Sequence, residues 1–132
     1  MLFRSVVVSG NVIHDVNSNW FDPAIRQEAP PAAIAVLFTS RSALGVNHAF
    51  ADGNVAARHI AITDNVIDSV PGTGIFASQA KDVILERNYL TRTGQHAFGI
   101  PLVDGRSIVV EQAASLHAVG NTATAAIVLP QR

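Results

Sequence analysis

The sequence contains no cysteine, few aromatic residues and few charges. Without cysteine, disulfides and thiolate metal sites are excluded. Aromatic residues make up 6% of the 132 residues and charged residues 14%, and the net charge is -1. Basic residues are not interleaved with aromatics, so the footprint of a nucleic-acid-binding protein is missing. No apolar run approaches the roughly 20 residues that span a bilayer. We therefore expect neither a nucleic-acid partner nor membrane insertion.

The sequence is instead rich in apolar residues that occur in short alternating segments. Hydrophobic residues make up 48% of the chain, which argues against disorder, and the length is that of one domain. No nucleotide-binding loop, metalloprotease motif or nucleophile elbow occurs in the sequence. Its organisation therefore has to be found in the alternating segments.

One pattern occurs four times: an alternating apolar segment, a polar corner and a second short alternating segment. It reads VVVSGNVI (6–13), IAITDNVI (60–67), VILERNYL (83–90) and, more weakly, IVVEQAAS (108–115). The corner residues Asn65 and Asn88 are 23 positions apart, and Ala113 follows 25 positions later. Such a period is typical of repeat proteins, in which each unit buries its apolar face only by stacking on its neighbours.

A third alternating segment lies between corners, at 33–37, 74–78 and 99–103. Three short strands per repeat predict an all-β fold, a right-handed parallel β-helix of about three and a half rungs. Strands of successive rungs would pair about 4.8 Å apart. Residues 17–32 and 41–57 lack alternation, and we expect two long inserted loops there. Because solenoid ends need caps, we expect residues 1–132 to form a single incomplete β-helix domain. It would be part of a longer protein or stable only in an assembly.

Alternation also predicts which side chains face the interior. The inward positions are Val6, Val8, Ile13, Ile34, Val36, Ile60, Ile62, Ile67, Ile75, Ala77, Val83, Leu85, Leu90, Ile100, Leu102, Ile108 and Val110. At the corners, asparagine tolerates the left-handed conformation of a tight bend, and stacked amides can bond from rung to rung. We therefore expect Asn11, Asn65 and Asn88 to form a structural ladder.

The segments IAITDNVIDSVPGTGIFAS (60–78) and VILERNYLTRTGQHAFGIPL (83–102) resemble the right-handed parallel β-helix superfamily, which includes the pectate-lyase-like proteins. The resemblance implies a carbohydrate-active or polysaccharide-binding module, part of a polysaccharide lyase or glycoside hydrolase, that is secreted, periplasmic or on the cell surface. The superfamily also includes adhesins without catalysis, so a structural or spike-like segment is the alternative. Pectate lyases bind calcium through clustered carboxylates. This sequence holds no such cluster, so we expect no cofactor.

In a stacked fold, equivalent positions form stripes on the surface. A basic stripe contains Arg4, Arg58, Lys81 and Arg106. It indicates either an anionic ligand, such as a uronate-containing glycan, or repeat ancestry at a solvated turn. A second stripe contains Ser9, Thr63, Glu86 and Glu111. It would place Glu86 beside Glu111 at about the 5 to 5.5 Å spacing of retaining glycosidases, unless both are merely exposed glutamates.

A third stripe places His14 over Asp68. A carboxylate beside an imidazole can raise the pKa of that imidazole, as a general base requires, so these two residues are the catalytic candidates. Trp20 would be a stacking platform for a sugar ring, and Arg26 and Arg92 would contact anionic groups. The alternatives are that Trp20 packs its loop onto the barrel and that His14 and Asp68 form a surface ion pair.

A fourth stripe is apolar but faces outward. Its members are Val7, Ala61, Ile84 and Val109, with Leu37, Phe76 and Pro101 on the third strand. An exposed apolar strip marks an interface or a covered surface. We expect an inserted loop to cover one part and a partner subunit, in a homo-oligomer, to meet the other. His48 and Asp52 are further polar candidates whose geometry the pattern does not fix.

Overall fold

The computed structural model describes residues 5–16, 32–36, 57–78, 80–96, 104–111 and 113–130. In these ranges the chain forms twelve β-strands and no helix. The strands make three four-stranded sheets, and every pairing within them is parallel. The prediction of an all-β fold with parallel strands is therefore confirmed.

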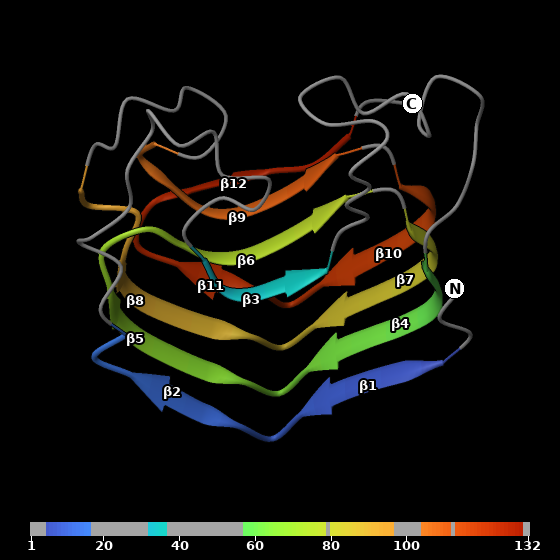
Figure 1. The fold of residues 1–132 in the computed structure, drawn as a ribbon, viewed down its shortest axis with the longest axis horizontal. Coiled ribbons are helices and arrows are strands. Elements are labelled where there is room, and N and C mark those ends of the chain that lie inside the picture. Colours follow the sequence, from blue (N-terminus) through green and yellow to red (C-terminus); the bar gives the residue numbers. More distant parts are fainter. Residues whose placement is uncertain are drawn as a thin grey trace, which may run out of the picture.

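The chain visits the three sheets in turn. The first sheet contains β1 (Val6–Ser9), β4 (Ala57–Thr63), β7 (Ala80–Glu86) and β10 (Ala114–Val119). The second contains β2 (Val12–His14), β5 (Val66–Val70), β8 (Tyr89–Thr93) and β11 (Thr122–Ala123). The third contains β3 (Ala32–Val36), β6 (Thr73–Ser78), β9 (Arg106–Glu111) and β12 (Ala126–Val128). Each strand pairs with the strand three positions earlier or later in the chain, or with both. Three consecutive strands therefore form one rung, and the described residues form four rungs (Figure 1). This order is consistent with a β-helix-like solenoid.

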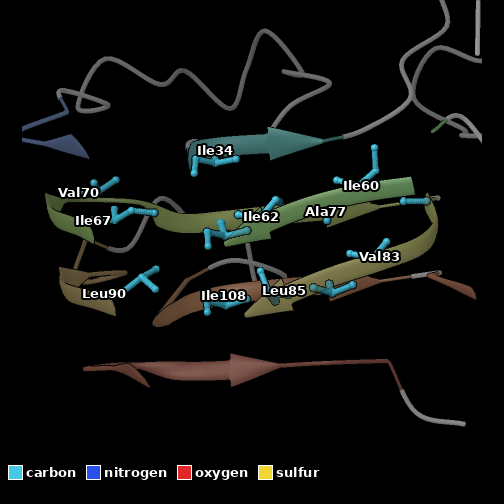
Figure 2. Close-up of a cluster of buried hydrophobic side chains, with 13 residues drawn as sticks. Ile34, Ile60, Ile62, Ile67, Val70, Ala77, Val83, Leu85, Leu90 and Ile108 are labelled. Atoms are coloured by element: carbon cyan, nitrogen blue, oxygen red, sulfur yellow. The ribbon is translucent and has the colours of Figure 1, made fainter. Parts of the chain in front are cut away.

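The core consists of aliphatic columns that run from rung to rung. On the first sheet, Ile60 pairs with Val83 and Ile62 with Leu85. On the second, Ile67 pairs with Leu90, and on the third, Ile75 pairs with Ile108. All seven of these isoleucine and leucine side chains and Val83 are at most 1% exposed. Figure 2 shows all of them except Ile75 with labels, between the sheets. The strand alternation therefore positions the core as the sequence predicts.

The fourth repeat does not lie where the sequence analysis places it. Residues Ile108–Val110 belong to β9 of the third sheet and pair with β6, not with β7. The fourth strand of the first sheet is β10, and its corner is Asn121, not Ala113. The chain thus has four described rungs, where about three and a half were expected. The error arose because an alternating strand of the third sheet has the same pattern as one of the first.

This correction also changes the apolar stripe. Val109 lies beside Phe76 on the third sheet, and the two are only 1% and 4% exposed. Val109 was expected beside Ile84, so its predicted place is wrong, whereas the burial of Phe76 agrees with the expectation that one part of the stripe is covered. Val7 and Ile84 of the first sheet are exposed as predicted, at 71% and 41%.

Several other expectations fall outside the described residues. These are the inward positions Ile100 and Leu102, the stripe members Leu37 and Pro101, and nearly all of the loops 17–32 and 41–57. Only the last residues of the two loops, Ala32 and Ala57, are described, and they begin β3 and β4.

Each rung bends between its first and second strand at the residue that precedes an asparagine. Gly10, Asp64, Arg87 and Gly120 have positive φ angles of 69°, 57°, 53° and 72°. The asparagines were expected to adopt this left-handed conformation themselves. Because the preceding residue adopts it instead, the asparagine side chain turns towards its neighbours in the stack.

The four asparagines form a continuous hydrogen-bonded ladder. Nδ2 of Asn11 donates to Oδ1 of Asn65 at 3.0 Å, Nδ2 of Asn65 to Oδ1 of Asn88 at 2.9 Å, and Nδ2 of Asn88 to Oδ1 of Asn121 at 2.9 Å. The backbone N–H of each donor residue bonds to the same oxygen. The predicted ladder is therefore present, with Asn121 as a fourth member.

Candidate functional site

The outer face of the second sheet carries two parallel columns of different character. Strand alternation after each corner places Val12, Val66 and Tyr89 in one outward column and His14, Asp68 and Thr91 in the next. The first column is exposed, and Tyr89 is 52% exposed. Both columns repeat at the rung spacing of about 4.8 Å. This face therefore presents an apolar and aromatic strip beside a polar one.

Asp68 is the most heavily bonded residue of the polar column. Arg92 donates through Nε to Oδ1 at 2.9 Å and through Nη2 to Oδ2. Thr91 Oγ1 donates to Oδ1 at 2.6 Å, and Ser69 Oγ donates to Oδ2 at 3.1 Å. These bonds, above all those from Arg92, hold the pKa of the Asp68 carboxyl well below its ordinary value. Asp68 is therefore a fixed carboxylate.

His14 lies beside Asp68 in the strand register, as the sequence predicts. Its imidazole, however, bonds through Nδ1 to Oδ2 of the next residue, Asp15, at 2.8 Å. Asp15 has a positive φ of 57°, and both side chains are exposed. The structure thus brings the two catalytic candidates to neighbouring positions and directs their side chains to other partners.

A surface hollow of about 390 Å³ adjoins the polar column, and it is lined by Ser69, Pro71, Arg92, Gln95 and His96. The segment after β8 is held against the segment after β5 by two backbone bonds. Gly94 N–H donates to Gly72 O at 2.6 Å, and His96 N–H donates to Pro71 O at 3.0 Å. The ion pair with Asp68 fixes the guanidinium of Arg92 at this hollow.

Sequence reasoning did not single out Gln95 and His96 as members of this site. They could have been predicted as site residues because β5 and β8 end side by side. In adjacent parallel strands, the residues that follow the two ends meet at one edge. Gln95 and His96 follow the end of β8, as Ser69 and Pro71 stand at the end of β5.

The basic stripe is shorter than predicted. Arg58 and Lys81 are in register on the first sheet. Arg106 lies on the third sheet, beside Ala126, and so does not extend the stripe. Arg4 falls outside the described residues. Nε of Arg58 is buried without a hydrogen-bond partner. This unpaired N–H lies on the strand position next to the second cation, Lys81.

The predicted pair of glutamates is not formed. Glu111 is in register with Ser78 on the third sheet, whereas Glu86 lies between Thr63 and Val119 on the first. The retaining-glycosidase arrangement is therefore wrong, because it depended on the incorrect position of the fourth repeat.

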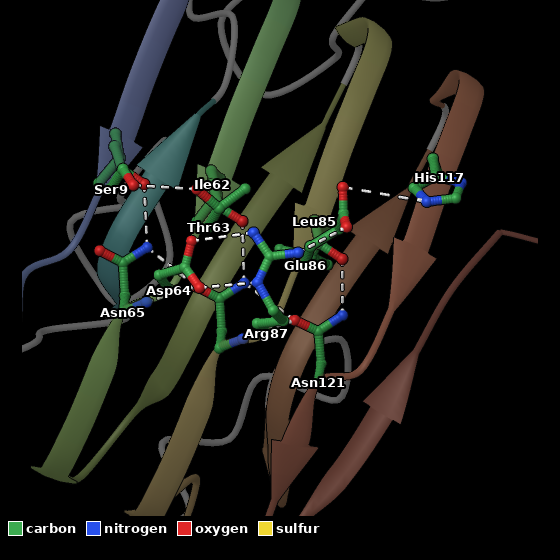
Figure 3. Close-up of polar contacts among 12 residues, drawn as sticks. Ser9, Ile62, Thr63, Asp64, Asn65, Leu85, Glu86, Arg87, His117 and Asn121 are labelled. Atoms are coloured by element: carbon green, nitrogen blue, oxygen red, sulfur yellow. Dashed lines mark hydrogen bonds and ion pairs between the residues drawn. The ribbon is translucent and has the colours of Figure 1, made fainter.

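Glu86 belongs instead to a network of charges at the corner (Figure 3). Arg87 donates to Oε2 of Glu86 at 3.0 Å and, through Nε and Nη2, to both carboxylate oxygens of Asp64 at 2.8 and 3.0 Å. Nε2 of His117 lies 3.9 Å from Oε1 of Glu86. The bonds from Arg87 lower the pKa of Asp64. This network ties the second rung to the third on the outer surface.

The remaining candidates, Trp20, Arg26, His48 and Asp52, lie outside the described residues. Within the described part of the chain, no group of three or more His, Asp or Glu residues could hold a metal ion. In the same ranges, no helix has the length and apolarity to cross a membrane. Comparison with family models, curated proteins and solved structures finds no match to this chain.

Proposed function

We propose that this chain is a right-handed parallel β-helix module that binds polysaccharide along the outer face of its second sheet. One observation carries the proposal: the exposed column Val12–Val66–Tyr89 runs beside the polar column His14–Asp68–Thr91. A sugar ring has an apolar face and a hydroxylated edge, and it needs both kinds of surface. The exposed ring of Tyr89 offers a stacking surface of this kind.

The hydrogen bonds around Asp68 indicate what remains for a ligand. All four strong acceptor sites of its two oxygens are taken by Arg92, Thr91 and Ser69. Arg92 uses two of its five N–H donors on this carboxylate. Its other donors can reach a sugar hydroxyl or, more strongly, a carboxylate. We therefore expect uronate-containing polysaccharides to bind better than neutral ones.

The same bonds favour binding over cleavage. A general base works best with a pKa near the operating pH, and the general acid of a glycosidase needs a raised pKa. The pKa of Asp68 is lowered by Arg92, so this carboxylate is a weak base and a poor proton donor. We therefore propose a module without turnover of its own. A secreted or cell-surface location and a relationship to pectate-lyase-like proteins belong to the same proposal.

Binding is tested with a panel of uronate-containing and neutral polysaccharides by affinity electrophoresis and titration calorimetry. Tyr89→Ala removes the exposed ring and is expected to weaken binding about tenfold. Ile84→Ala is the matched control, because Ile84 is outward and 41% exposed in the same rung but lies on the first sheet. If wild type binds no member of the panel, or if both variants bind equally, the proposed face is wrong.

The absence of turnover is tested on the same panel by release of reducing ends and of unsaturated products. Wild type is expected to release neither. Cleavage that His14→Ala abolishes would restore the catalytic interpretation of His14 and Asp68 and overturn this part of the proposal.

A second candidate function is that of a rigid structural segment, as in an adhesin or spike. The uninterrupted asparagine ladder through four rungs favours it, because such a ladder stiffens the stack without serving a ligand. High thermal stability together with no binding to any polysaccharide would support this alternative over the first.

A further inference from the structure

The two ends of the stack present complementary surfaces. The outermost strands are β1, β2 and β3 at one end and β10, β11 and β12 at the other. Among the described strands, none pairs with their outer edges. On the first two sheets their inward residues are only partly buried: Val6, Val8 and Ile13 at the first end, and Leu116, Ala118 and Ala123 at the second. On the third sheet, Ile34 of β3 is buried. On the first two sheets, the apolar columns that are closed in the middle rungs therefore meet no further described strand at either end.

The asparagine ladder gives the stack a direction. Every backbone N–H and Nδ2 in it donates to Oδ1 of the asparagine in the following rung. By this geometry, Asn121 directs two donors outward from the fourth rung. Asn11 directs the acceptor Oδ1 outward from the first rung. The fourth-rung end of the asparagine ladder thus presents hydrogen-bond donors, and the first-rung end presents an acceptor.

A second bond of each asparagine points the opposite way. Nδ2 of Asn65 donates to Val8 O at 3.0 Å, Nδ2 of Asn88 to Ile62 O at 2.9 Å, and Nδ2 of Asn121 to Leu85 O at 2.7 Å. In each case the acceptor is the carbonyl three residues before the asparagine of the preceding rung. Asn11 bonds instead to Ser9 O of its own rung, at a longer 3.3 Å. The equivalent carbonyl for Asn11 would be that of Ala118 in a rung stacked before it.

We propose that copies of this chain associate head to tail, with the fourth rung of one copy stacked on the first rung of the next. Backbone N–H and Nδ2 of Asn121 donate to Oδ1 of Asn11 in the second copy. Nδ2 of that Asn11 exchanges its local bond for Ala118 O. The same register places Leu116 on Val6 and Ala118 on Val8, so that each column continues through the junction.

Charge does not oppose this register. On the outer face of the first sheet, the stacking places His117 beside Val7 and Val119 beside Ser9, so no like charges meet. Such an interface is heterologous and does not close on itself, so the product is an open rod whose length grows with concentration. The outer face of the second sheet stays free in the rod, and the inference does not depend on polysaccharide binding.

The test uses sedimentation velocity of the full chain over a wide range of concentrations. Wild type is expected to form a series of oligomers of increasing length as the protein concentration rises. Val8→Lys blocks the first-rung end and Ala118→Lys blocks the fourth-rung end. At an open end the lysine stem can carry its ammonium to water, whereas a stacked copy would bury it. Each variant alone is expected to remain monomeric.

Mixing the two variants identifies the arrangement. Each retains one competent end, so an equimolar mixture is expected to give dimers and nothing longer. Val7→Lys, on the same strand but outward and 71% exposed, is the control and should associate like wild type. If Val8→Lys does not fold by circular dichroism, Asn11→Ala takes its place, with association expected to weaken at least about tenfold through loss of the acceptor. Monomeric wild type, variants that still form rods, or a mixture that stays monomeric would each overturn the proposal.

Discussion

Oδ1 of Asn88 accepts two hydrogen bonds from Asn65, one from the backbone N–H at 3.2 Å and one from Nδ2 at 2.9 Å. Both residues are at most 1% exposed. Each therefore satisfies the donors and acceptors of a buried amide entirely through neighbouring rungs. A buried polar network of this kind is stabilising only while it is complete.

Removal of the amide from the middle of the ladder should therefore be costly. Asn88→Ala leaves the backbone N–H and one Nδ2–H of Asn65 without partners. Oδ1 of Asn121 and the carbonyl oxygen of Ile62 each lose the bond from Nδ2 of Asn88, although Oδ1 of Asn121 keeps the bond from the backbone N–H of residue 88. At about 1 to 3 kcal/mol for each of these two unsatisfied donors, the free energy of unfolding should fall by about 2 kcal/mol or more. Asn11→Ala, at the exposed end of the ladder, should cost less than about 1 kcal/mol. Urea unfolding of the two variants measures this, and equal losses would contradict the ladder.

The ladder could be predicted from the sequence because position and chemistry agree there. An asparagine recurs at the point where alternation breaks, and few residues can stack at such a corner. The fourth member was missed although a signal existed. Gly120-Asn121 repeats the Gly10-Asn11 pair of the first corner, but it lies 33 positions after Asn88, outside the period set by the two preceding repeats.

The strand register predicts opposite results for two neighbouring residues of β7. Leu85 is fully buried and stacks on Ile62, whereas Ile84 is 41% exposed. Leu85→Ala should lower the free energy of unfolding by about 2 to 5 kcal/mol through lost burial and a cavity. Ile84→Ala should change it by about 0.5 kcal/mol. Denaturant midpoints decide between them, and a larger loss at Ile84 would mean that the register is wrong.

Alternation identified inward and outward positions but could not tell one sheet from another. Val109 and Ile84 both occupy outward positions of regular strands, yet Val109 is 1% exposed. The difference depends on which sheet the strand joins and on what packs over that sheet, and neither is encoded locally. The same limit placed Glu111 beside Glu86. For His14 and Asp68 the strand register was predicted. The ion pair between Asp68 and Arg92, one position beyond Thr91, was not predicted.

Acid should destabilise the protein through Asp64 and Asp68. Their pKa values are lowered from 3.8, by Arg87 and Arg92 respectively. A carboxyl whose folded pKa lies below its unfolded pKa stabilises the fold above the unfolded value. That contribution disappears as the pH falls through the folded value. The thermal midpoint should therefore decrease below about pH 4.

The variant Asp68→Asn isolates one of these contributions. It should melt at a lower temperature than wild type at pH 5, because the carboxylate that Arg92 and Thr91 bind is gone. The difference between the two midpoints should shrink towards pH 2, where the wild-type carboxyl also begins to lose its charge. A difference that stays constant from pH 5 to pH 2 would show that the ion pair does not contribute to the acid sensitivity.

Two glycines with the same backbone conformation should differ sharply in their tolerance of alanine. Gly10 and Gly94 have φ angles of +69° and +68°. A Cβ at Gly10 would meet nothing within 4 Å, whereas one at Gly94 would lie 2.5 Å from the backbone oxygen of Arg106. Gly10→Ala therefore carries only the conformational cost, about 1 kcal/mol. Gly94→Ala adds a clash with backbone that no side-chain rotation relieves.

We expect Gly94→Ala to lower the free energy of unfolding by about 3 kcal/mol or more. It should also disturb the hollow, because the bond from Gly94 N–H to Gly72 O holds the segment that carries Gln95 and His96. Urea unfolding gives the first effect, and polysaccharide titration of the folded variant gives the second. Gly10→Ala serves as the control for left-handed strain alone. Equal losses in the two variants would mean that the close approach of the chain after β8 to Arg106 is not part of the native structure.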